Sequence, residues 1–99
     1  MANRILIDLG DVCAEAGRTD RAVEHLERAL ALSDLAQAPN FRALALVSLS
    51  RVHEQHGDLA EAVEALEESL QLWRSLHDTV RADQTAADLD RLAGAAQHR

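Results

Sequence analysis

The chain has 99 residues, enough for one domain with a modest core and too few for a large enzyme. Hydrophobic residues form 47% of it but aromatic residues only 2%, and the abundant alanine and leucine are strong helix formers, which favours an all-α fold. The net charge is −7 and every basic residue is arginine, which argues against nucleic-acid and anionic-membrane binding and excludes a Schiff-base lysine.

The first predicted helix covers residues 3–16. Its apolar residues recur at helical spacing and form one stripe along the helix: Leu6, Leu9, Val12 and Cys13. Gly17 then stands where the end of a helix needs a left-handed residue. A second amphipathic run predicts a helix over 19–36. Together the two runs predict a helical hairpin.

A shift of about forty residues aligns the chain with itself. The identical pairs include Leu6 with Leu46, Leu9 with Leu49, Val12 with Val52, Gly17 with Gly57, Ala22 with Ala62, Leu26 with Leu66, and Leu30 with Leu70. The second unit is therefore predicted to be another hairpin, with helices over 40–56 and 59–77. Asn40 is its expected first N-cap, and Asp58 with Glu61 has the spacing of a capping box.

A fifth helix is predicted over 79–96, capped by Asp78 or Thr79. It is either a capping helix or the first half of a third repeat. Helical-repeat arrays usually need about three units, because each unit buries its apolar face only against neighbours. Two alternatives follow: the chain self-associates through an exposed end or face, or it is a piece of a longer array.

The repeated residues resemble the tetratricopeptide repeat family. Its pattern reads here as Leu6, Leu9-Gly10, Cys13, Gly17, Ala22, Leu26 and Ala29, then Leu46, Leu49-Ser50, His53, Gly57, Ala62, Leu66 and Ser69. Cys13 and His53 replace an aromatic residue of the pattern, and Leu6 and Leu46 replace another. The period of about forty, instead of about thirty-four, is similar to a long-period subclass found in bacterial regulators and kinesin light chains.

The resemblance implies an all-α superhelix of antiparallel helical hairpins. Its parts would be one repeat at about 3–36, a second at about 40–77, and the capping helix or half repeat at about 79–96. It also implies a noncatalytic scaffold that binds a protein or peptide. The alternative is a self-assembly module, a homodimer for example.

In that family the first helix of each unit lines a concave groove. The residues at the matching positions are Arg4, Ile7, Asp11, Leu44, Val47, Arg51, Gln55 and Arg91. Arg51 and Arg91 are available to hold a carboxylate, or else each pairs with a neighbouring Glu54 or Asp88. A carboxylate clamp of the chaperone-binding type is not expected, because uncharged or acidic residues occupy its positions.

The second helix of the second unit carries a run of acidic residues that we call the acidic ridge: Glu61, Glu64, Glu67 and Glu68. It is either an ordinary solvated surface or a docking site for a basic partner.

No catalytic, cofactor or metal site is expected. His53 and His56 lie three residues apart, whereas a zinc hydrolase helix needs four. Cys13 occupies a position that is buried in the resembling family, where a thiol is inert. Trp73 is expected to pack against the fifth helix, with partner contact as the alternative.

A cytoplasmic location is the expectation. Cys13 is the only cysteine, so no intrachain disulfide forms, and Asp8 and Asp11 interrupt the apolar run near the N-terminus. The lysine-free, arginine-rich and alanine-rich composition is typical of a GC-rich bacterial genome.

Overall fold

In the computed structural model, residues 2–97 are described, with side chains over residues 4–94. Five helices form this part of the chain: α1 (Ala2–Glu15), α2 (Thr19–Leu35), α3 (Pro39–Gln55), α4 (Leu59–Ser75) and α5 (Thr79–Gln97). The five predicted helices are confirmed, and each end lies within two residues of the expected one. Both α2 and α4, and likewise α3 and α5, begin forty residues apart, as the repeat predicts.

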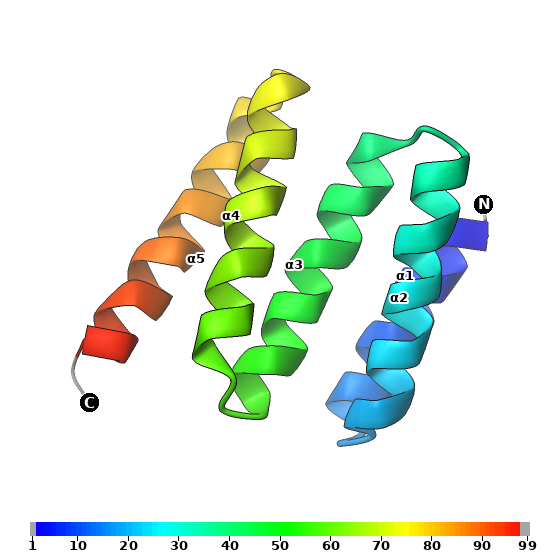
Figure 1. The fold of residues 1–99 in the computed structure, drawn as a ribbon, viewed down its shortest axis with the longest axis horizontal. Coiled ribbons are helices and arrows are strands. Elements are labelled where there is room, and N and C mark those ends of the chain that lie inside the picture. Colours follow the sequence, from blue (N-terminus) through cyan, green and yellow to red (C-terminus); the bar gives the residue numbers. More distant parts are fainter. Residues whose placement is uncertain (1, 98–99) are drawn as a thin grey trace.

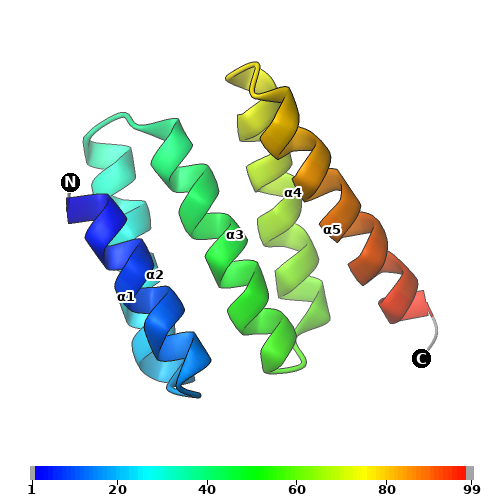
Figure 2. The same ribbon diagram turned by 180° about the vertical axis from the view of Figure 1, so that it is seen from behind.

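The helices form two layers. Helices α2 and α4 lie on the side that faces the viewer in Figure 1, whereas α1 and α5 lie in front in the reverse view of Figure 2. Each helix packs against the next along the chain, and α1 also contacts α3. The shortest extent of 17 Å fits two stacked helices. The expected all-α array of antiparallel hairpins, an α-α superhelix, is confirmed.

The turns of the two hairpins use the predicted glycines. Gly17 has φ of +77° and Gly57 has φ of +86°, in the left-handed region that glycine adopts without strain. The turns that join one hairpin to the next element have the same conformation but no glycine. Gln37 stands there with φ of +53°, and His77 with φ of +59°.

One predicted helix start and one predicted capping box are wrong. Helix α3 begins at Pro39, after Ala38 as the N-cap, because proline fits the first turn, where no N–H partner is needed. Asp58 is the N-cap of α4 as predicted, but its side chain makes no capping hydrogen bond, so there is no capping box. The prediction for α5 is confirmed, since Asp78 Oδ1 accepts a hydrogen bond from the Arg81 N–H at 3.1 Å.

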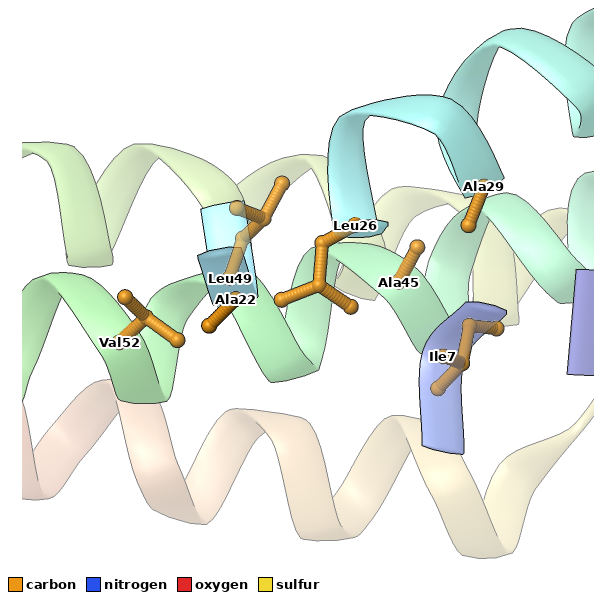
Figure 3. Close-up of a cluster of buried hydrophobic side chains, with 7 residues drawn as sticks. All are labelled: Ile7, Ala22, Leu26, Ala29, Ala45, Leu49 and Val52. Carbon is orange, nitrogen blue, oxygen red and sulfur yellow. The ribbon is translucent and has the colours of Figure 1, made fainter. Parts of the chain in front are cut away.

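The core of the first hairpin is built around Leu26. Figure 3 shows it among the buried residues Ile7, Ala22, Ala29, Ala45, Leu49 and Val52. Gly10 lets α1 approach this side chain, because a Cβ at that position would lie 2.6 Å from Leu26 Cγ. Small residues at the crossings and leucine between them thus set the separation of α1, α2 and α3.

The second hairpin is joined to α5 by two further clusters. Ala62, Leu66 and Leu92 form one, and Ala43, Trp73 and Ala82 form the other. Trp73 is only 3% exposed and packs against the start of α5, which confirms the packing expected from the sequence.

The apolar stripe predicted on α1 is only partly buried. Leu9 is 42% exposed and Val12 61%, whereas their counterparts Leu49 and Val52 are 7% and 2% exposed. The difference arises because α2 packs on α3, while no described helix packs on the corresponding side of α1. Of the predicted stripe, Leu6 and Cys13 are therefore partly buried, whereas Leu9 and Val12 are exposed.

Candidate functional site

A cavity lies between α3 and α5, beside the last turn of α4. Its volume is about 530 Å³. It is lined by Leu44, Val47, Arg51, Trp73, Arg81, Gln84, Thr85, Ala87 and Asp88.

A second, smaller cavity lies between α1 and α3, with a volume of about 180 Å³. It is lined by Arg4, Ile7, Asp8, Asp11, Leu44, Val47, Ser48, Arg51 and Arg81. Because four residues line both cavities, the two form one continuous surface across α1, α3 and α5, which we call the groove. The four shared residues are Leu44, Val47, Arg51 and Arg81.

Helical spacing explains why these side chains gather on one surface. In α3 the groove residues lie three and four apart, at 44, 47 and 51, and those of α1 follow the same spacing at 4, 7 and 11. The remaining sides of α3 are used for packing, with Leu49 and Val52 facing α2 and Ala43 facing α4. The groove side of α3 is therefore the side turned away from α2 and α4.

The centre of the groove combines an apolar floor with positive charge. Leu44 and Val47 supply the floor. Arg51 is exposed, and within residues 4–94 it has no ion-pair partner. Arg81 lies over the Trp73 ring at 5.0 Å from its centroid and forms an ion pair of 3.4 Å with Asp78. Because Arg51 pairs with no carboxylate of the described chain, its guanidinium is available to bind a carboxylate of a ligand.

The α1 end of the groove has the opposite character. Asp8 and Asp11 line it, and Arg4 forms only an exposed ion pair of 3.5 Å with Asp8. Pairs of this kind contribute little to stability, so their groups exchange partners readily. The groove is thus acidic beside α1 and basic between α3 and α5.

The structure brings six of the eight sequence-predicted groove residues together and leaves two out. Ile7 is among the six, but at 5% exposed it belongs mostly to the core. Gln55 is exposed near the end of α3 and lines neither cavity. Arg91 donates two hydrogen bonds to Glu54, at 2.6 and 3.1 Å. Of the two alternatives for Arg91, pairing with a carboxylate of this chain is therefore the one that the structure shows.

The Arg91 to Glu54 pair ties α5 to α3. The hydrogen bond from Arg91 lowers the pKa of Glu54, against the opposing effect of partial burial. Arg91 is thereby engaged within the chain, and Arg51 is the arginine of the predicted pair that stays available.

Arg81 is a groove residue that the sequence reasoning missed. The predicted stripe on α5 was anchored on Arg91, and Arg81 lies near the start of the helix, beside the capping residue Asp78. Helical steps of three and four residues back from Arg91 reach Asp88, Gln84 and then Arg81, which all line the cavity, so continuing the count to the start of α5 would have found Arg81.

Two sequence profiles, both described as tetratricopeptide repeat, match the chain, one at residues 5–39 and the other at 42–80. The chain belongs to the tetratricopeptide repeat family. The two matches correspond to the two hairpins, and α5 lies almost wholly beyond them. Tetratricopeptide repeats generally mediate protein–protein interaction and are typically noncatalytic. No curated protein matches the sequence.

The acidic ridge lies on α4, in the layer opposite the groove, and its four glutamates are exposed. Glu68 is already engaged, because Arg42 of α3 donates to it at 2.7 Å and also binds Asp34 of α2 at 3.0 Å. In the ridge of this tetratricopeptide repeat array, Glu61, Glu64 and Glu67 are thus exposed and make no ion pair among the described residues.

The remaining candidates for chemistry are dispersed. His53 is half-buried and His56 is exposed at the end of α3, and Cys13 is a partly buried free thiol. Within the part of the chain that the structure describes, no group of three metal-ligating side chains is close enough to hold an ion. None of the described helices combines the length and the apolar character needed to cross a membrane.

Proposed function

We propose that this chain is a noncatalytic scaffold that binds a segment of another protein in the groove across α1, α3 and α5. The observation that carries the proposal is the combination at the centre of the groove. An apolar floor of Leu44 and Val47 lies beside Arg51, which has no ion pair among the described residues. Membership of the tetratricopeptide repeat family supports the same class of function.

The groove chemistry defines the kind of segment it takes. An apolar side chain would rest on Leu44 and Val47, and a carboxylate would bind the Arg51 guanidinium bidentately. A basic residue of the same segment would lie toward Asp11. An extended segment or one face of a helix can supply these groups, and both are recurring modes of peptide recognition.

The test is a double substitution, Val47→Asp with Arg51→Glu, made on the full chain. It removes the apolar floor and reverses the central charge, so it is expected to abolish binding of a partner captured from lysate. Arg51→Glu alone, at an exposed position, guards against an effect of Val47→Asp on folding. The matched control is Arg21→Glu, an identical charge change on α2 at the position where the second repeat carries Glu61. Unchanged binding by both groove variants would refute the role of the groove.

Docking of a basic partner on the acidic ridge is a second candidate. The three glutamates that have no arginine partner within the described residues favour it. The double substitution Glu61→Arg with Glu64→Arg would weaken the binding of such a basic partner. The groove variants would leave its binding unchanged.

Self-association is opposed by charge. Each copy carries a net charge of −7, and Asp83 and Asp90 are exposed on α5, the last helix of the array. A head-to-tail stack would bring these carboxylates against another acidic chain. We therefore expect a monomer by light scattering at micromolar concentration, whereas a stable dimer would favour the self-assembly alternative.

The sequence also supports a cytoplasmic location for the scaffold and a role within a bacterial regulator. The lone cysteine fits the cytoplasm, and the forty-residue period and arginine-rich composition fit a bacterial regulator.

A further inference from the structure

A strip of apolar side chains on α1 is exposed although its counterpart in the second repeat is core. Ile5 is 59% exposed, Leu9 42% and Val12 61%. They lie four and three residues apart and so form one line along the helix. We call them the α1 strip. Contiguous exposed apolar surface of this kind marks an interaction site more often than scattered single residues do.

The second repeat shows what fits such a strip. Forty residues on, the same line of α3 is formed by Ala45, Leu49 and Val52, each at most 7% exposed. Helix α2 covers it, with Leu26 in contact between the small residues Ala22 and Ala29 (Figure 3). The occupant that matches the strip is therefore an amphipathic helix with a small–Leu–small line at i, i+4 and i+7.

The charges beside the strip narrow the choice of occupant. Asp8 and Glu15 are exposed and lie one turn from Ile5 and Val12 respectively. Arg4 lies 3.5 Å from Asp8 and offsets its charge, so Glu15 supplies the unpaired negative charge beside the strip among the described residues. A helix with basic residues flanking its apolar line is electrostatically complementary, whereas a second copy of this acidic chain is not.

We propose that the α1 strip is a second docking site, separate from the groove, which takes a basic amphipathic helix of another protein. The docked helix lies on α1 as α2 lies on α3. It extends the array by one helix at its N-terminal end, and it does not need the groove.

The chain itself provides the probe. A labelled peptide of residues 19–35, held helical by a hydrocarbon staple joining positions 24 and 28, reproduces the α2 line without disturbing it, because both positions are exposed in α2. A basic version carries Asp20→Arg and Glu27→Arg, which reverses the sign of the peptide charge. A third version carries Leu26→Asp and lacks the central apolar contact. Fluorescence anisotropy measures the binding of each to the full chain.

We expect the basic peptide to bind more tightly than the parent peptide, with an advantage that shrinks as salt is added. The Leu26→Asp peptide should not bind. In the protein, Leu9→Asp should weaken binding of the basic peptide by at least about tenfold, because it removes one buried leucine contact. Val80→Asp places the same change at a 66% exposed valine at the other end of the array, and it should have no effect.

Three results would overturn the proposal. One is that the basic peptide binds wild type, Leu9→Asp and Val12→Asp with the same affinity, while circular dichroism shows that all three proteins are folded. Another is no binding of either the parent or the basic peptide to wild type. The third is a dimer of the unbound chain that Leu9→Asp dissociates, because a second copy would then be the occupant of the strip.

Discussion

Four turns of the chain end a helix with a left-handed residue, but only two of them use glycine. Gln37 and His77 adopt φ of +53° and +59° and carry a side chain there. A Cβ in this conformation is strained by about 1 kcal/mol relative to glycine. The first repeat and the second repeat share this feature, so it belongs to the turns between hairpins and not to one local sequence.

Gln37→Gly should therefore raise the free energy of unfolding by up to about 0.5 kcal/mol, because the relief of strain exceeds the added entropy of the unfolded chain. Chemical denaturation followed by circular dichroism measures it. Ala36→Gly is the control, since Ala36 has φ of −83° and gains nothing from glycine. A loss of stability in the Gln37 variant as large as in this control would contradict the interpretation of the turn.

Gly10 is needed for the opposite reason, a close approach of two helices. A Cβ there would lie 2.6 Å from Leu26 Cγ, and Leu26 is fully buried and has no room to move. Gly10→Ala should lower the free energy of unfolding by about 1–2 kcal/mol, although alanine favours the helix. Gly94→Ala, with nothing within 4 Å of the new Cβ, should instead raise it. Equal effects in thermal denaturation would show that the approach at Gly10 is not tight.

At this scale the sequence predicted the two glycine turns and the caps at Asp58 and Asp78, but not the turns at Gln37 and His77 or the start of α3. Gly17 and Gly57 were identifiable because only glycine adopts their conformation freely. Asparagine is a good N-cap, so the prediction of Asn40 as the N-cap of α3 was reasonable. The helix begins one residue earlier, because Pro39 is also stable in the first turn of a helix.

Among the elements, α1 and α3 show how position in the array changes the role of one pattern. Their apolar lines are equivalent by the forty-residue shift, yet one is exposed and the other is core. Sequence periodicity identifies which residues form a line. It does not say whether a neighbouring helix is present, so the burial of Leu9 and Val12 was beyond its reach.

The pairing of α3 with α5 has a pH dependence that can be worked out from its carboxylate. The pKa of Glu54 is lowered in the folded chain by the hydrogen bond from Arg91. The pair therefore contributes stability above the unfolded pKa of the carboxyl, and that contribution is lost as the pH falls through the folded pKa.

Glu54→Gln should lower the free energy of unfolding at neutral pH by up to about 1 kcal/mol, since the pair is partly exposed to solvent. The difference from wild type should disappear in acid, where both chains lack the charge. Glu67→Gln, on the acidic ridge, should change stability little at neutral pH. A difference between wild type and Glu54→Gln that persists unchanged into acid would exclude the ion pair as its cause.

At the scale of the whole molecule, the repeat predicts the array but not its unequal ends. The forty-residue period, the five helices and the all-α superhelix follow from the sequence because each depends on local spacing. The groove follows in outline, through Leu44, Val47 and Arg51. The engagement of Arg91 by Glu54 and the position of Arg81 over Trp73 depend on how α5 sits on the second hairpin, which spacing does not fix.

Residue-specific photo-crosslinking tests the central claim, that the groove is where a partner binds. A photoreactive phenylalanine analogue replaces Gln84 in the groove, or Glu67 on the acidic ridge as the matched exposed control. The protein is irradiated with its captured partner, and the adducts are identified by mass spectrometry. We predict an adduct from position 84 and none from position 67. A partner that crosslinks only from position 67 would contradict a groove-binding function and place the interface on the acidic ridge.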